Sequence, residues 1–239
     1  YQTVDAEMTD RTPAGCDKRK GDDGAWGGSA GALFTLSPAM RVGVSYRSAV
    51  SYTLEGDRSL GVTSTSAKAD LKMPDTFILS VWQQVSDRWE AMGDLSYTRW
   101  NTLDKLNVQY TTAGVARTDT EAFDYDNSWR IAWGAAYKAS DAWKIKFGIA
   151  YDRTPTSDST RTARVPDNDR IWFSFGGQWN GGVYGRIDAG YAYLYLRDAN
   201  IGQTNTFATP AGTIVGVSNL RGTYSDSAHI VGVQYSKGF

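Results

Sequence analysis

The clearest pattern in the chain is a strict alternation of apolar with small or polar residues from Trp129 to Tyr151, in the sequence WRIAWGAAYKASDAWKIKFGIAY. Successive side chains of a strand point to opposite faces, so the pattern predicts two antiparallel strands joined by a short polar turn near 139–141. Each arm is about ten residues long and ends in large aromatic residues. These are features of strands that cross a bilayer, with an apolar outer face and aromatic residues at both interfaces.

The same alternation recurs along most of the chain. Nine strands are predicted, at 25–36, 40–56, 68–85, 89–112, 129–138, 143–152, 169–179, 183–198 and 222–239. Every second connection is short (37–39, 86–88, 139–141, 180–182), whereas the others are longer and polar (57–67, 113–119, 154–167, 199–221). Short periplasmic turns and long extracellular loops are typical of outer-membrane barrels. We therefore predict an all-β fold, a transmembrane antiparallel up-and-down β-barrel, over 25–239. Residues 1–24 are polar and without period, and we expect an extracellular loop or tail there.

The number of predicted strands is odd. Nine up-and-down strands place the first and last in the same direction, whereas bacterial barrels are antiparallel with an even number of strands. An open sheet would expose unpaired backbone groups to lipid. We therefore expect an incomplete barrel, in which at least one strand is missing before Ala25 or another chain supplies it. The chain begins at Tyr1 rather than Met, which indicates a processed or truncated product.

Composition narrows the class further. The net charge is -1 and there is no basic run, so no nucleic-acid partner is expected. No apolar run approaches the roughly 18 residues of a membrane helix. The 14 Tyr and 9 Trp are the aromatic types that favour a membrane interface. Cys16 is the only cysteine, so no intrachain disulfide can form.

The sequence offers little for catalysis. His229, the only histidine, shares its parity with Val231 and Val233 and is expected to face lipid, whereas a hydrolase histidine must face its nucleophile in a cleft. No metal-ligand spacing is present, and PDNDR (166–170) resembles the start of a calcium loop without its Gly and distal Glu. Glu90 and Asp94 could in principle do acid–base work, but lumen charges are the favoured interpretation. We predict no enzyme activity, no metal and no cofactor.

Many charged residues fall on the face opposite the apolar one, which predicts a polar lumen. They are Arg41, Arg47, Arg130, Lys138, Lys144, Lys146, Arg170 and Arg186, with Glu90, Asp94, Asp152 and Asp188. Buried charges of this kind must be paired or hydrated. Two interpretations stay open: a salt-bridge network that stiffens the wall, which we favour, and a cation-lined route for an anionic head group.

Four stretches resemble the C-terminal part of the FadL family, the outer-membrane transporters of long-chain fatty acids and other hydrophobic molecules. They read VGVSYRSAVSY (42–52), LKMPDTFILSVWQQVSDRWEAMGDLSYTRW (71–100), WRIAWGAAYKASDAWKIKFGIAYDRTP (129–155) and VPDNDRIWFSFGG (165–177). They occur in family order, and the chain ends on Phe239, as outer-membrane barrels commonly do. The combination of MPD, YTRW, YDRTP and VPDNDR is more specific than any one of these motifs.

The resemblance implies a 14-stranded barrel in the bacterial outer membrane, plugged by an N-terminal hatch. It also implies passive transport, in which an apolar groove among the extracellular loops captures the substrate and an opening in the wall releases it sideways into the membrane. The hatch, with the family's Asn-Pro-Ala element, and about five strands are absent from this sequence.

The resemblance also bears on the substrate. Fatty-acid transporters of the family carry a cationic residue near GVARTDTEAFDYDNS (114–128), but here the aligned position is Glu121 and the nearest cation is Arg117. A carboxylate beside Glu121 would be disfavoured by like charge, so uncharged hydrocarbons are a rival substrate class. The predicted substrate-binding residues are Arg47, Trp100, Arg117, Phe123, Arg130 and Arg170.

Two other functions remain open: a general aqueous porin, and a structural or adhesive surface barrel with loops 154–167 and 199–221 as epitopes. The expected partners are a hydrophobic small molecule, outer-membrane lipid and lipopolysaccharide, and the missing strands or another chain that would close the barrel.

Overall fold

Nearly the whole chain is β-strand. A computed structural model describes residues 1–12, 15–208 and 214–238, and the predicted terminal residue Phe239 lies outside them. The only helical segments in these ranges are the three-residue 3-10 turns η1 (Trp100–Thr102) and η2 (Gly182–Tyr184), so no helix there can span a membrane. The chain divides into two compact units, one of 1–30, 46–76 and 98–127 and the other of 31–45, 77–97 and 128–239.

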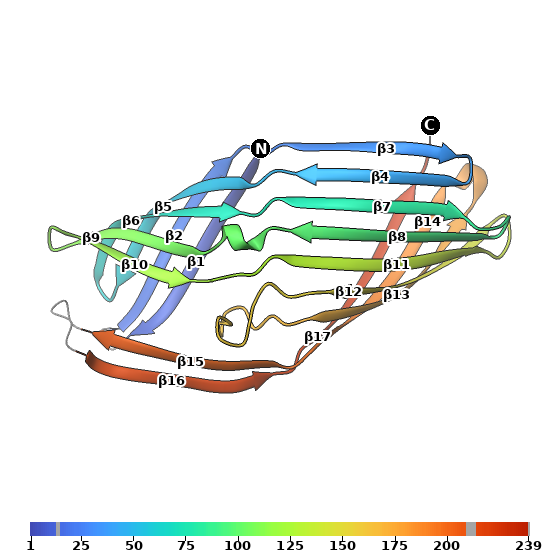
Figure 1. Cartoon of the computed structure of the whole chain (residues 1–239). Helices are drawn as coiled ribbons and strands as arrows, with labels where there is room; N and C mark the ends of the chain where they lie inside the picture. Colours follow the sequence, from blue (N-terminus) through green and yellow to red (C-terminus); the bar gives the residue numbers. More distant parts are fainter. Residues whose placement is uncertain (13–14, 209–213, 239) are drawn as a thin grey trace. The chain divides into compact units, whose positions relative to one another are not determined.

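The second unit is built on a nine-stranded sheet in the order β17-β14-β13-β12-β11-β8-β7-β4-β3 (Figure 1). Its strands are β3 (Ser29–Ser37), β4 (Met40–Arg47), β7 (Thr76–Gln84), β8 (Trp89–Thr98), β11 (Ser128–Lys138), β12 (Trp143–Asp152), β13 (Arg170–Asn180), β14 (Arg186–Leu196) and β17 (Ser227–Ser236). Each of the nine predicted strands corresponds to one strand of this sheet, and the short turns between them are confirmed. The predicted strands 40–56, 68–85 and 89–112 are too long, because each also covers part or all of a strand of the other unit's sheet. Among the described residues the sheet is not closed, because β3 and β17 are its two edges, as expected of a partial barrel.

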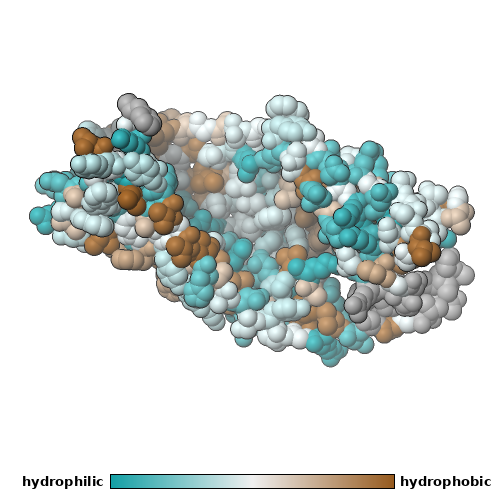
Figure 2. All heavy atoms as spheres, turned by 180° about the vertical axis from the view of Figure 1, so that it is seen from behind, coloured by the Kyte–Doolittle hydropathy of each residue, from teal (hydrophilic) through white to brown (hydrophobic). Residues whose placement is uncertain are grey.

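One face of this sheet is apolar and open to the surroundings. Strand register aligns its side chains in rows, for example Trp133–Ile149–Phe173–Tyr193–His229 and Ala135–Phe147–Phe175–Tyr191–Val231. Phe175 is 62% exposed and Val231 is 75% exposed. Hydrophobic side chains accordingly lie on the surface of the molecule (Figure 2). His229 lies on this face, as predicted, and shares a 2.7 Å hydrogen bond between Nδ1 and the Tyr191 hydroxyl.

The opposite face of the sheet carries ion pairs between strands. Lys144 Nζ lies 2.6 Å from Glu90 Oε1, and Lys146 Nζ lies 2.8 Å from Asp188 Oδ1. The Trp82 indole N–H also donates to Glu90, at 3.3 Å. Lys144, Lys146, Glu90 and Asp188 are therefore paired across strands, which is the pattern expected of a stiffened wall.

The first unit holds a six-stranded sheet in the order β1-β2-β5-β6-β9-β10. Its strands are β1 (Gln2–Thr12), β2 (Gly15–Ala25), β5 (Val50–Leu60), β6 (Thr63–Met73), β9 (Lys105–Thr112) and β10 (Val115–Ala122). The long connections are thus hairpins, where the sequence predicted loops at 57–67 and 113–119. Residues 1–24, expected to be a loop or tail, contain the β1–β2 hairpin.

The predicted loop 199–221 also contains strand. β15 (Ala199–Ala208) and β16 (Ile214–Tyr224) pair with each other as a separate two-stranded sheet in the second unit. The connection 154–167, by contrast, is irregular, and its threonines pack against the following aspartates. The Thr154 hydroxyl donates to Asp167 Oδ2 at 2.6 Å, and the Thr154 N–H donates to Asp169 Oδ1 at 3.1 Å. PDNDR therefore anchors a loop through hydrogen bonds.

Candidate functional site

One face of the six-stranded sheet carries an apolar pocket of about 250 Å³. Alternate residues of β5, β6 and β9 point to the same face of this sheet, because register pairs Leu54 with Ala69 and Ala69 with Val108. Leu54, Ala69 and Val108 are all buried. The apolar lining comprises Ala6, Met8, Gly21, Leu54, Ala67, Ala69, Leu71, Leu106, Val108 and Phe123. Leu54, Ala69 and Val108 fall within the predicted strands 40–56, 68–85 and 89–112, so period-two alternation places them on one face. The remaining lining comes partly from 1–24 and 57–67, where a tail and a loop were predicted.

A cluster of four charged side chains shows that this sheet is strongly curled. Arg19 of β2 lies 2.9 Å from Asp119 of β10, although three strands separate β2 from β10 in the sheet. Arg19 also lies 2.9 Å from Asp17, and Arg58 lies 2.7 Å from Asp17. Asp17 is only 1% exposed. The cluster Asp17–Arg19–Arg58–Asp119 therefore connects β2, next to one edge of the sheet, with the edge strand β10 across the pocket-lining face.

Tyr110 completes this cluster. Its hydroxyl donates to Asp119 Oδ1 at 3.1 Å, and the Arg58 guanidinium lies 4.0 Å from the centroid of its ring. Burial raises the pKa of Tyr110, and the nearby Asp119 carboxylate raises it further. Tyr110 therefore stays neutral and can donate its hydrogen bond at physiological pH.

The cations around the pocket already have acidic partners. Lys20 and Lys18 lie 3.0 Å and 2.7 Å from Glu7, and their hydrogen bonds lower the pKa of Glu7 below its ordinary value. Lys68 lies 3.0 Å from Glu55. Together with Arg19, which is held by the buried cluster, these are the cations beside the apolar lining. None of the three lining cations, Arg19, Lys20 and Lys68, is left without an acidic partner among the described residues.

Two glycines face each other where β2 and β5 pair, and one of them, Gly21, lines the pocket. Gly21 and Gly56 are register partners in β2 and β5. A Cβ on Gly56 would lie 2.1 Å from the Lys20 carbonyl oxygen and 2.8 Å from the Gly21 Cα. Only glycine permits this close approach of the two strands.

The structure separates the six predicted substrate-binding residues into several places. Phe123 lines the apolar pocket, and its ring lies 5.3 Å from that of Tyr125, which in turn lies 6.1 Å from that of Trp100. Arg117 lies on the exposed part of β10, and Arg47 ends β4 with an exposed side chain. Phe123 and Trp100 are thus joined through Tyr125, whereas Arg47 and Arg117 lie apart from the apolar lining.

Arg130 and Arg170 lie together on the charged face of the nine-stranded sheet. Both pair in register with Asp152, and Arg170 Nη2 lies 3.2 Å from Asp152 Oδ2. The Arg130 guanidinium lies 5.3 Å from the Trp172 ring centroid. The Nε atoms of both arginines and the Trp172 Nε1 are buried without a hydrogen-bond partner. This row offers N–H donors to an anionic group.

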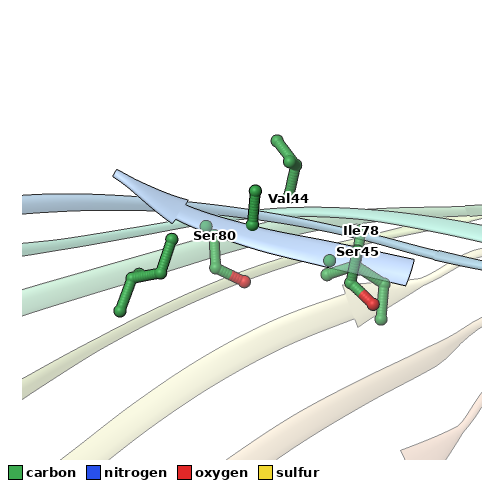
Figure 3. A pocket seen from close by; sticks show the side chains of 8 residues that line it. Val44, Ser45, Ile78 and Ser80 are labelled. Atoms are coloured by element: carbon green, nitrogen blue, oxygen red, sulfur yellow. The ribbon is translucent and has the colours of Figure 1, made fainter. Parts of the chain in front are cut away.

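A second hollow lies on the nine-stranded sheet among β3, β4 and β7, with a volume of about 350 Å³ (Figure 3). Ser45, Ile78 and Ser80 point to one side of the sheet there, and Val44 points to the other. Its lining is largely glycine, alanine and serine, so it offers less apolar contact than the pocket in the first unit. In the described ranges, no three His, Cys, Asp or Glu side chains are grouped so as to hold a metal ion.

A nine-stranded sheet with an apolar exposed face and a charged opposite face defines the wall of an outer-membrane β-barrel. The chain belongs to the family of outer membrane transport proteins described as OMPP1/FadL/TodX, whose model matches residues 4–239. This confirms the FadL resemblance and the placement in the outer membrane.

Individual relatives agree with this assignment. The chain is 30% identical to outer membrane protein P1 of Haemophilus influenzae, over 87% of this chain and 46% of that protein. A crystal structure of a Pseudomonas aeruginosa FadL homologue matches with a TM-score of 0.76 and 22% identity, over 97% of this chain and 59% of that one. The Pseudomonas putida toluene transporter TodX shares the fold, with a TM-score of 0.59 and 18% identity over 96% and 55% of the two chains. The chain spans about half the length of the curated relatives it matches.

Of the residues that line the pocket, only Phe123 was predicted from the sequence to bind substrate. Leu54, Ala69, Leu71 and Val108 were available as alternate positions in 50–60, 63–73 and 105–112. Their alternation is interrupted at the strand ends by charged residues such as Arg58, which obscures the period. The charged cluster had no local signal, because its members are brought together only by the curling of the sheet.

Proposed function

We propose that the chain takes part in the passive uptake of hydrophobic compounds across the outer membrane, and that the apolar pocket of the six-stranded sheet binds the compound first. Family membership supports uptake of this kind. The pocket is formed by the long connections, which in this class of barrel lie on the extracellular side. The observation that carries the proposal is the apolar lining around a volume of about 250 Å³.

The size of the pocket favours small compounds. An apolar cavity of about 150 Å³ holds benzene, whereas pockets for larger ligands begin near 300 Å³. A volume of about 250 Å³ fits one substituted aromatic ring or a short alkyl segment. A long-chain fatty acid would be only partly enclosed.

The charges around the pocket favour uncharged compounds. A carboxylate needs an available cation, but Lys20, Lys68 and Arg19 are each paired with an acid. A carboxylate ligand would have to displace such an acid, which weakens its binding, whereas an uncharged hydrocarbon leaves these ion pairs intact. We therefore infer that the pocket selects uncharged alkyl or aromatic hydrocarbons over fatty acids.

Arg130 and Arg170 belong to a later step in this proposal. Their buried Nε–H groups, together with the Trp172 N–H, would donate hydrogen bonds to a polar substituent of an uncharged compound that carries one. Sideways release through the barrel wall is also part of the proposal, supported by the family resemblance.

Equilibrium binding to the full-length protein in detergent tests the proposal. Ala67→Phe fills the pocket, and Ser66→Phe, one residue away on the opposite face of β6, is the matched control. We expect Ala67→Phe to weaken toluene binding by more than about tenfold, because the ring occupies the ligand volume. Ser66→Phe should leave toluene binding unchanged, and dodecanoate should bind the unmodified protein more weakly than toluene does.

The same protein in planar bilayers separates uptake from a general porin. A large steady ion conductance with no hydrophobe binding would show an aqueous pore and contradict the proposal. Equal toluene affinity for Ala67→Phe and Ser66→Phe would show that the compound binds outside the pocket.

A further inference from the structure

The apolar face of the nine-stranded sheet ends, on the side of the long connections, in a row that contains two arginines. Register pairs Tyr151 with Ile171 and Ile171 with Tyr195. Arg153 follows β12 and Arg197 follows β14, two residues further along the same face. Asp169, immediately before β13, lies between them. The Arg197 N–H donates to the Asp169 carbonyl at 3.0 Å, which places these two residues side by side.

This row lies at the depth of lipid head groups. From Trp143, at the short-turn end of β12, to Arg153 is a span of about 33 Å along the strand. A tilt of about 40° reduces it to about 25 Å, the height of the apolar band of an outer-membrane barrel. Arg153 and Arg197 therefore emerge just above the lipid-facing tyrosines, in the leaflet on the extracellular side.

The two arginines keep much of their donor capacity. The Asp169 carboxylate already accepts hydrogen bonds from the Tyr151 hydroxyl, at 2.6 Å, and from the Thr154 N–H, at 3.1 Å. Its contact with Arg197 is a looser ion pair of 3.6 Å, and the Arg197 side chain is 66% exposed. No carboxylate of the described residues lies within ion-pair distance of the exposed Arg153 guanidinium. Two guanidinium groups around one committed carboxylate leave a net positive charge.

A related arrangement occurs elsewhere in the chain. Arg99 donates from its N–H to the Asp75 carbonyl at 3.1 Å and from its Nε to Asp75 Oδ1 at 2.7 Å. The sequence repeats Tyr-x-Arg at 97–99, 151–153 and 195–197, each time where a strand reaches the long-connection side. An aspartate held by hydrogen bonds, with an exposed arginine next to it and a lipid-facing tyrosine two residues before that arginine, thus recurs along this edge.

We propose that Arg153 and Arg197 bind a phosphate group of the phosphorylated glycolipid in the outer leaflet. Their strands are two positions apart in the sheet, so their Cα atoms lie about 10 Å apart and both side chains can reach one phosphate. Arginine matches phosphate oxygens with paired N–H donors. Tyr151 and Tyr195, directly below, supply an interfacial surface for the lipid beneath the phosphate.

The test is native mass spectrometry of the full-length protein in detergent, titrated with diphosphorylated lipid A. Each arginine at a membrane surface adds to the binding free energy of an anionic lipid. Arg153→Ala or Arg197→Ala should therefore weaken lipid A binding about fivefold, and the double variant about 25-fold. Arg88→Ala is the matched control. Arg88 is an exposed arginine in a short turn, at the opposite end of the strands, and lies 3.4 Å from the Tyr137 hydroxyl.

Two further arms identify the source of the phosphate. Dephosphorylated lipid A should bind wild type and double variant equally weakly, and millimolar inorganic phosphate should not displace the lipid. Wild-type affinity in the double variant, an equal loss in Arg88→Ala, or full displacement by inorganic phosphate would overturn the proposal. Toluene binding by the double variant should equal wild type, so the outcome is independent of the proposed uptake function.

Discussion

The buried Asp17 is expected to hold the six-stranded sheet in its curled form. Its Oδ2 accepts three hydrogen bonds, from Arg58 Nη2 at 2.7 Å, Arg58 Nε at 3.1 Å and Arg19 Nη2 at 2.9 Å. Asp17→Asn removes the charge while keeping the size of the side chain. Two guanidinium groups that are only 12% and 16% exposed would then share Asp119 as their remaining acid.

The expected cost follows from these contacts. Removing one partner of a buried ion pair typically costs about 3–5 kcal/mol, because the remaining charge stays desolvated. Asparagine retains one acceptor oxygen and Asp119 remains in place, so we expect the lower end, about 3 kcal/mol. This corresponds to an increase of about 100-fold in the equilibrium constant for local opening of the sheet.

Hydrogen–deuterium exchange of the full-length protein measures this opening directly. Amides of β2 and β5 should lose protection in Asp17→Asn, whereas those of β12 and β13 in the other unit should not. Glu7→Gln, which breaks an exposed pair with Lys18 and Lys20, is the control and should leave exchange unchanged. Protection of β2 and β5 at the wild-type level in Asp17→Asn would refute the role assigned to the cluster.

Three other predictions test separate parts of the structure. The hydrogen bond from Arg99 lowers the pKa of Asp75 below its ordinary value of 3.8. This ion pair therefore stabilises the fold above pH 3.8, and its contribution is lost as the pH falls through the lowered pKa. Wild type and Asp75→Asn should converge in thermal stability in strong acid, and a difference that stays constant with pH would contradict this. Gly56→Ala should destabilise the protein by about 1–3 kcal/mol in denaturant titrations, because its Cβ would overlap the facing strand; an unchanged midpoint would show that the strands can separate. Phe175→Arg, in the middle of the apolar face, should lower the free energy of unfolding in lipid by about 2–4 kcal/mol. Ser174→Arg, on the charged face, should lower it by less. The reverse order would show that the two faces are assigned the wrong way round.

The wall could be predicted from the sequence because its pattern is local. In 129–137 and 143–151 every second residue is apolar, and all of these except Ala135 are large. The residues between them are small or charged, so the sequence of one strand indicates which face is apolar. The same holds for the polarity of the opposite face, where Lys144, Lys146 and Glu90 were expected and are paired.

The six-stranded sheet could not be predicted in the same way. β2 reads GCDKRKGDDGA, and its partner β1 is held to it partly by Lys18 and Lys20 on Glu7, so cross-strand charge pairs replace apolar alternation. Strands β4 and β5 follow each other with only 48–49 between them, so the sequence merges them into one predicted strand. Asp17 and Asp119 meet through long-range curling, for which no short stretch of sequence carries a signal.

Anomalous diffraction from crystals of the full-length protein, soaked with a brominated monoaromatic compound, shows whether an uncharged hydrophobic compound occupies the apolar pocket. We expect a bromine peak among Leu54, Ala69 and Val108, which disappears in Ala67→Phe and persists in Ser66→Phe. A bromine peak elsewhere in the protein, with this pocket empty, would show that the pocket is not the binding site.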